Sequence, residues 1–506
     1  MTDDAMDSPP ADRKPILRPG ETCWRIARAG RMTPIVDAAD YFTAAKSAMM
    51  KARHSILLVG WDFDTRITLE RDGHRQDAPN RLGRFLRWLV RERPDLRIHL
   101  LKWDPGIVQS LGHGIMPLVL LQMASRRRVR FKLDRHHPVA ACHHQKIVVI
   151  DDALAFCGGI DITVDRWDTS DHADRNPNRR RPDGSLHGPW HDVTTAVDGE
   201  VARALGELAR ERWRQATGEG LPVPPEGGDL WPDGLAPMLR DIDVAIARSQ
   251  PEHEDQPEAR EIEALYLQAI GSAQRTIYLE SQYFASRRIA EAIVRRLGEP
   301  EGPEIVVVNP ETADGWLEEE VMGSARARLL SLIGRSDTHG RFRLYTPVTE
   351  GGTPIYVHAK VMVIDDRLLR VGSSNLNNRS LGLDTECDLA VEAGEEDRDL
   401  RRAIVAFRNR LLAEHLGKSV EEAGEAFARS ASFIQAVEGL RGSERSLRPF
   451  VPPELTEEEK ALTETDLLDP ERPGRSLDSL RRFLTLLTSR FLPRLGWPVA
   501  RSREPS

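Results

Sequence analysis

Two short segments of the chain carry the same pair of chemically active side chains. His144 and Lys146 are two residues apart, and so are His358 and Lys360. Alternate side chains of a β-strand point to the same face, so each pair can project an imidazole beside an ammonium group. Transfer at a phosphodiester needs a nucleophile, an acid for the departing alkoxide and positive charge near the phosphoryl oxygens. Two such pairs supply all of these groups, so we predict phosphodiester chemistry with no metal and no other cofactor.

The two pairs belong to an internal repeat, in which residues 143–163 parallel residues 357–377. A single histidine near a strand is more often a packing residue than a catalyst. Two copies with the same following Asp and the same small-residue turn favour catalysis instead. The matched positions are His144 with His358, Lys146 with Lys360, Asp151 with Asp365, Gly158 with Gly372, and Asp161 with Asn375.

The elements that must position these residues are strands and helices in alternation. Each motif is predicted to form two short strands joined by an Asp-Asp turn, in which Asp151 and Asp365 bind turn amides as structural supports. Upstream, residues 42–64 and 265–285 each have the pattern of an amphipathic helix followed by a buried strand. This βα alternation in both halves predicts two similar α/β lobes around one shared active site, with a helical C-terminal tail.

The expected domain organisation follows from the repeat and from a charged, Pro-containing stretch between its copies. We expect a flexible N-terminal segment, a first lobe, a linker, a second lobe and a helical C-terminal extension, at residues 1–32, 33–248, 249–260, 261–415 and 416–506.

Two carboxylates are candidates for orienting the histidines. Glu386 follows His358 at a distance that would let a returning strand place it beneath that imidazole and set the tautomer of the ring. In the first half, His172 occupies the corresponding offset. Asp168 is therefore the candidate for the same role beside His144.

The chain resembles the phospholipase D family over residues 38–392. The motifs that carry the resemblance are HHQKIVVID, AFCGGIDIT, RWD, PWHDV, IYLESQYF, VHAKVMVID and GSSNLNNRSLGLDTE. Together with RHHP at residues 135–138, PWHDV is similar to true phospholipases D rather than to the nucleases of the superfamily. The resemblance implies the phospholipase D-like fold, in which each lobe is a mixed sheet flanked by helices.

The resemblance also implies roles for individual residues. One histidine attacks phosphorus to form a phosphohistidine, and the other protonates the leaving alcohol and then activates water or another alcohol. His144 would be the nucleophile and His358 the acid, although the order could be reversed. The residues implied to hold phosphoryl oxygens are Lys146, Lys360, Asn375 and Asn377, and those implied to line or brace the pocket are Gln282 and Glu280.

The leading hypothesis is a phospholipase D that cleaves the distal phosphodiester of a glycerophospholipid, with phosphatidylcholine as the expected substrate and transfer to alcohols beside hydrolysis. A cardiolipin-synthase-like phosphatidyltransferase is the alternative, and a nuclease is a weaker one. The net charge of −8 argues against a nucleic acid partner. We expect a monomer that meets phospholipid and a water or alcohol acceptor at a membrane surface.

Localisation signals are sparse. The first residues lack the apolar core of a signal peptide, and the longest apolar run is well short of the roughly 20 residues that cross a bilayer. A cytoplasmic protein with peripheral membrane contact is expected, with secretion by another route left open. Residues 477–494 have the pattern of a basic amphipathic helix, which would either lie on a membrane or dock on the core.

Histidines and cysteines also gather just before the first motif. His136, His137, Cys142, His143 and His144 fit no common metal-ligand spacing, and the second copy of the repeat lacks them. No metal site is expected there. The four cysteines are scattered and are expected to be reduced thiols.

Overall fold

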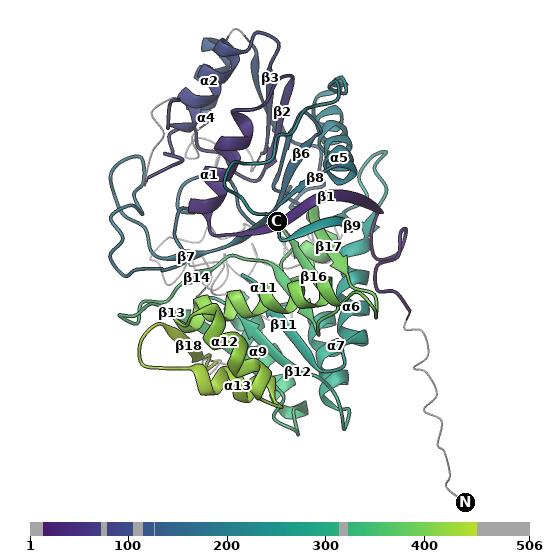
Figure 1. Ribbon diagram of the computed structural model, residues 1–506. Helices are drawn as coiled ribbons and strands as arrows, with labels where there is room; N and C mark the ends of the chain where they lie inside the picture. The colour runs from purple at the N-terminus through teal and green to yellow at the C-terminus, as the bar shows by residue number, and fades with distance from the viewer. Residues whose placement is uncertain (1–13, 72–77, 105–114, 126, 313–321, 453–506) are drawn as a thin grey trace, which may run out of the picture.

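A computed structural model of the chain describes residues 14–71, 78–104, 115–125, 127–312 and 322–452. Two α/β lobes share one mixed sheet, in which the strand order is β18-β13-β12-β11-β15-β16-β17-β9-β1-β8-β6-β5-β2-β3-β4. Figure 1 shows the first lobe above the second, with β1 and β9 between them. The two-lobed α/β class predicted from the sequence is the one observed.

The first lobe contains the N-terminal copy of the repeat. Its elements are β1 (Arg25–Val36), α1 (Ala38–Met49), β2 (Ser55–Gly60), α2 (Leu82–Glu92), β3 (Arg97–Trp103), α4 (Ile115–Ala124), β4 (Val129–Asp134), β5 (Ile147–Ile150), β6 (Leu154–Gly158), β7 (Trp190–His191), β8 (Val193–Asp198) and α5 (Glu200–Thr217).

The second lobe repeats this order and adds a C-terminal subdomain. Its elements are β9 (Leu239–Gln250), β10 (Ala259–Arg260), α6 (Glu261–Ser272), β11 (Thr276–Glu280), α7 (Arg287–Leu297), β12 (Glu304–Val308), α9 (Ser324–Ser336), β13 (Phe342–Val348), β14 (Tyr356–Val357), β15 (Val361–Ile364), β16 (Leu368–Gly372), α10 (Asn378–Gly382), β17 (Glu386–Glu392), α11 (Arg398–Leu416), α12 (Val420–Arg429), α13 (Phe433–Leu440) and β18 (Ser446–Pro449).

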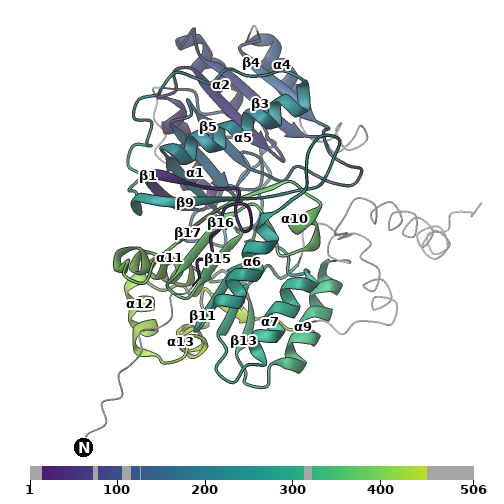
Figure 2. The same ribbon diagram turned by 90° about the vertical axis from the view of Figure 1, so that its right-hand side faces the viewer.

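The sheet is pseudosymmetric about the antiparallel pair β1 and β9. On one side β2, β3 and β4 are parallel and β5, β6 and β8 follow antiparallel. On the other side β11, β12 and β13 are parallel and β15, β16 and β17 repeat the antiparallel path. The parallel strands need helical crossovers, which explains why helices flank both faces of each lobe. Figure 2 shows α6, α7 and α9 on one side of the second lobe and α11, α12 and α13 on the other.

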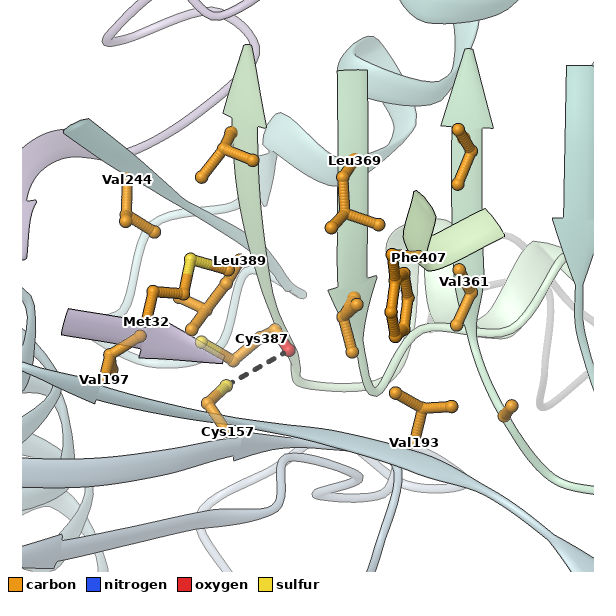
Figure 3. Packing of buried hydrophobic residues seen from close by; sticks show 14 of the residues in the cluster. Met32, Cys157, Val193, Val197, Val244, Val361, Leu369, Cys387, Leu389 and Phe407 are labelled. Atoms are coloured by element: carbon orange, nitrogen blue, oxygen red, sulfur yellow. Dashed lines mark hydrogen bonds between the residues drawn. The ribbon is translucent and has the colours of Figure 1, made fainter. Parts of the chain in front are cut away.

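The apolar core is continuous across the two lobes. One cluster of buried side chains includes Met32 and Val193 from the first lobe and Val361, Leu389 and Phe407 from the second (Figure 3). Each lobe also has a cluster of its own, which includes buried residues of α1 and α2 in the first lobe and of α6 and α7 in the second. Because the central cluster draws on both copies of the repeat, its burial stabilises the arrangement of the lobes as well as each lobe.

Several other expectations from the sequence can be compared with the structure. All four cysteines are free, as expected. Within the described residues, every helix is too short or too polar to span a bilayer. The predicted linker 249–260 includes the end of β9 and the short strand β10, while the domain boundaries themselves stay a prediction. The amphipathic helix predicted over residues 477–494 lies outside the described residues.

Candidate active site

The two repeated histidines meet where the lobes join. His144 lies three residues before the start of β5, and His358 lies between β14 and β15. Each backbone N–H donates to a carbonyl of the opposite lobe, His144 to Thr385 and His358 to His191, both at 2.8 Å. The short pair β7 and β14 joins the lobes at this level (Figure 1). The centroids of the two imidazole rings are 6.4 Å apart, so the two halves form one site.

A carboxylate from the opposite lobe holds each imidazole. Nδ1 of His144 lies 3.0 Å from Oε1 of Glu386, and Nδ1 of His358 lies 2.7 Å from Oδ2 of Asp192. Because an ionised carboxylate can only accept, Nδ1 is the protonated nitrogen in both rings and Nε2 keeps its lone pair. Each ring is therefore held in the tautomer that can attack phosphorus or exchange a proton through Nε2.

This pairing corrects the sequence prediction. Glu386 was expected beneath His358 and Asp168 beneath His144, but Glu386 contacts His144 and Asp192 contacts His358. Counting offsets within one copy of the repeat assumed that a carboxylate serves its own lobe. The lobes face each other, so each carboxylate reaches across the interface.

Asp192 is the functional residue that the sequence reading missed. The motif PWHDV contains it, but this motif served there only as a mark of the family. Asp192 directly precedes β8, as Glu386 begins β17 in the other lobe. A Cβ at Gly159 would lie 2.2 Å from Oδ1 of Asp192, so the glycine leaves the room that this carboxylate needs.

The two lysines differ in their partners. Nζ of Lys146 lies 3.3 Å from Oδ2 of Asp161. Nζ of Lys360 has the neutral Gln282 at 3.4 Å instead, because Asn375 stands where the first copy has Asp161. Each lysine also donates to the carbonyl of the histidine two residues before it. Burial, and then repulsion from Lys146, lower the pKa of Lys360 to about 7, although Asp192 opposes the shift.

Burial dominates the electrostatics of the histidines. Burial and the two lysine charges hold the pKa of both His144 and His358 well below the ordinary value. Burial also raises the pKa of Glu386 to about 7 and that of Asp192 to about 6. The imidazoles are thus neutral before substrate binds. An anionic phosphate would offset the lysine charges and allow one ring to take up the proton that a general acid needs.

The Asp residues of the two motifs lie away from this chemistry. The carboxylate of Asp151 accepts from the amides of residues 53, 54 and 55 at 2.6–2.8 Å. That of Asp365 accepts from the amides of residues 274, 275 and 276 at 2.8–2.9 Å. Each Asp follows the strand whose other end carries the histidine. They tie the start of β2 and β11 to the catalytic hairpins.

The remaining predicted pocket residues have diverse partners. Gln282 donates to the hydroxyls of Tyr283 and Tyr356 as well as accepting from Lys360. Oδ1 of Asn375 is buried and has no hydrogen-bond partner among the residues that the structure describes, so it is available to a ligand-borne donor. Asn377 caps α10 by accepting from the amide of Ser380 at 3.2 Å, which is a structural task.

Glu280 and Asp168 belong to a second, fully buried polar cluster. Glu280 accepts from His191 at 2.9 Å and from His415 at 3.0 Å. Asp168 accepts from His172 at 2.9 Å and from Arg179 at 2.7 Å. Neither carboxylate contacts a repeated histidine. The cluster supports the site through the backbone, because it fixes His191, and the next residue, Asp192, holds the ring of His358.

This cluster also holds four side chains whose ligand atoms are close enough together to bind a metal. Ligand atoms of Asp37, His172, His191 and Glu414 all lie within 4.8 Å of one another. Hydrogen bonds already join them, including His191 to Glu414 at 2.8 Å and His172 to Glu414 at 3.2 Å. Although burial opposes it, the surrounding carboxylates raise the pKa of His172 to about 10. A protonated histidine can thus supply the positive charge that a metal would bring.

Aromatic rings wall both sides of the site, and the sequence reading did not predict them. Trp190 stacks on Tyr356 at 4.5 Å between ring centroids and lies 5.3 Å from the ring of His358. Trp61 lies edge-on to His144 at 6.5 Å and is stacked on Trp103. Such rings shield the histidines from water and present apolar surface to a substrate.

Comparisons with known proteins agree with a duplicated chain. A family model described as "Phospholipase D" matches residues 48–227, and one described as "Cardiolipin synthase, PLD-like domain" matches residues 266–405. Phospholipase D A of Dictyostelium discoideum is 26% identical over 458 residues, covering 76% of this chain and 35% of that protein. Phospholipase D delta of Arabidopsis thaliana is 24% identical over 581 residues, covering 81% of this chain and 66% of that protein. The chain thus spans about a third of one relative and two thirds of the other.

The solved structures include one with the same fold. The crystal structure of phosphatidylserine synthase from Haemophilus influenzae Rd KW20 superposes with a TM-score of 0.50 and 13% sequence identity, covering 76% of this chain and 88% of that one. At this identity the likeness concerns the fold alone.

Proposed function

The chain belongs to the phospholipase D superfamily, and we propose that it cleaves the distal phosphodiester of glycerophospholipids, with phosphatidylcholine as substrate. The products are phosphatidic acid and the free head group. One observation carries the proposal: two His-Lys pairs share one site, with imidazole rings 6.4 Å apart and each ring held by a carboxylate of the other lobe. A phosphoryl group placed between the rings would meet a nucleophile on one side and an acid on the other.

The reaction proceeds in two steps through a phosphohistidine. Nε2 of His144 attacks phosphorus, and the bond to the head-group oxygen breaks as His358 transfers its Nε2 proton to that oxygen. Water or an alcohol then attacks the phosphohistidine while His358 takes its proton, which releases His144. Lys146 and Lys360 stabilise the phosphoryl oxygens, and Asn375 is positioned as a further ligand. The assignment of nucleophile and acid rests on the family resemblance.

The setting of this reaction belongs to the same proposal. The enzyme acts as a monomer on phospholipid at a membrane surface, with water or an alcohol as acceptor and peripheral contact from the cytoplasm. One observation favours a second candidate function, that of a phosphatidyltransferase: residues 266–405 of the second lobe match the family model described as "Cardiolipin synthase, PLD-like domain". A phosphatidyltransferase would use the same intermediate and pass it to a second lipid alcohol.

The test is release of phosphatidic acid from phosphatidylcholine vesicles, with EDTA and a little primary alcohol present. We expect activity in EDTA, a phosphatidyl-alcohol product, and losses of at least about 10³-fold in His144→Ala and His358→Ala. His339→Ala is the matched control, because His339 is exposed and lies in the turn between α9 and β13.

Two other outcomes would change the assignment. Cardiolipin formed from phosphatidylglycerol alone, without hydrolysis of phosphatidylcholine, would favour the transferase. Cleavage of DNA with no activity on any glycerophospholipid would keep the site and overturn the substrate.

A further inference from the structure

Arg166 is a buried cation of the site that has no hydrogen-bonded or ion-paired partner among the described residues. Its side chain lies in the RWD motif, and the residue is only 8% exposed. Its guanidinium carbon lies 4.3 Å over the ring of Trp190. Its Nε is buried without a hydrogen-bond partner, and the guanidinium forms no hydrogen bond or ion pair with any described residue. A buried charge normally has both, because leaving water is costly for an ion.

The position of Arg166 ties it to the proposed reaction. Trp190, on which it rests, lies 5.3 Å from the ring of His358. The positive charge of Arg166 is among the causes that hold the pKa of His358 low, after burial and Lys360. The same charge helps Asp192 to stay ionised. Arg166 therefore acts on the His358 side of the site.

The other two cations of the site have partners, and the repeat contains no second copy of Arg166. Lys146 faces Asp161, and Lys360 faces Gln282. Ser380 stands at the same offset from His358 as Arg166 from His144. Arg166 thus adds one positive charge that the duplication does not explain.

We propose that Arg166 binds a non-bridging oxygen of the substrate phosphoryl group, as a third cation beside Lys146 and Lys360. This inference rests on the proposed function. A guanidinium presents N–H groups in a rigid plane that suits two phosphate oxygens at once, and a lysine in its place would offer only a point charge. Stacking on Trp190 holds that plane in one orientation before substrate arrives.

If Arg166 only supported the packing of Trp190, its substitutions would have different effects. Methionine keeps much of the packing on the indole but has no charge, and lysine keeps the charge but lacks the planar set of N–H groups. Arg166→Met and Arg166→Lys therefore separate phosphate binding from packing. Arg180→Met is the matched control, because Arg180 lies nearby in the chain, is exposed and bonds a backbone carbonyl.

Two measurements on the full chain make the test: the affinity for inorganic phosphate by calorimetry, and kcat/KM on a short-chain, monomeric phosphatidylcholine. For Arg166→Met we expect phosphate affinity and kcat/KM each to fall about 10- to 100-fold, the usual effect of losing a charged hydrogen bond. Arg166→Lys should recover part of both, and Arg180→Met should match the wild type.

The outcomes separate this inference from the proposed function. Wild-type phosphate affinity in folded Arg166→Met would overturn the inference, whatever happens to kcat/KM. Equal losses of activity in the Met and Lys variants with phosphate affinity unchanged would show that Arg166 only supports Trp190. A wild-type protein that binds phosphate through Arg166 but hydrolyses no phospholipid would refute the proposed function and keep the oxyanion site.

Discussion

At the scale of single residues, the crossed carboxylates set the conditions under which the histidines work. Glu386 and Asp192 accept hydrogen bonds from Nδ1 of the two rings, and only their ionised forms also stabilise a positive charge on the imidazole. Burial raises their pKa values to about 7 and about 6, respectively. Each carboxylate is protonated below its pKa and then no longer offsets the positive charge that its imidazole must carry during the reaction. Activity should therefore decline as the pH falls through about 7, with a further decline near 6.

The variant Glu386→Gln tests this explanation of the decline in activity at low pH. We expect kcat to fall about 10- to 100-fold, because a neutral amide orients the ring of His144 poorly and does not stabilise its positive charge. The acid limb of kcat/KM should move from about 7 towards about 6, where Asp192 still titrates. A pH series with a monomeric substrate measures both. An acid limb that stays in place would contradict the role of Glu386, and Glu263→Gln on α6 is a buried control paired with Arg288.

At the scale of elements, the two motif aspartates join each catalytic hairpin to the neighbouring parallel strand. Asp151 and Asp365 have φ values of 48° and 53° and each accept three backbone N–H groups. Changing either to Ala leaves those amides unpaired and strains the backbone, so we expect the free energy of unfolding to fall by about 3 kcal/mol. Urea titration measures this loss, and kcat of the protein that remains folded should stay within about tenfold of wild type. Asn tolerates the left-handed region and keeps one acceptor, so Asp151→Asn should lose less. Full stability with lost kcat would instead indicate a catalytic Asp.

At the scale of the whole molecule, one chain builds one site from both of its lobes. The central pair β1 and β9, the pair β7 and β14 and the shared apolar core hold the lobes together. A mixture of His144→Ala and His358→Ala should therefore stay inactive, because no chain in it carries both histidines. Co-expression of the two variants followed by the vesicle assay measures this. Activity near a quarter of the wild-type value or more would show that lobes exchange between chains.

The sequence by itself determined the local part of this protein. The two-residue spacing of His and Lys, the Asp-Asp turns and the copied segments depend on short-range geometry, and the duplication predicted two α/β lobes, which the fold confirms. The support role expected for Asp151 and Asp365 agrees with their bonds to backbone amides, because a turn and the strand beside it interact through a few nearby residues.

Only the tertiary structure decided what faces what across the interface. Glu386 belongs with His144 and Asp192 with His358, and no spacing within one copy of the repeat contains these pairings. They depend on how two similar lobes turn towards each other, which is set by burial of the shared core and by pairing of β1 with β9. Asp168 illustrates the same limit, since it lies in the second buried polar cluster rather than beside His144, as its position in the chain suggested. The chemistry of the side chains is readable from the sequence, whereas their partners follow from packing between residues far apart in it.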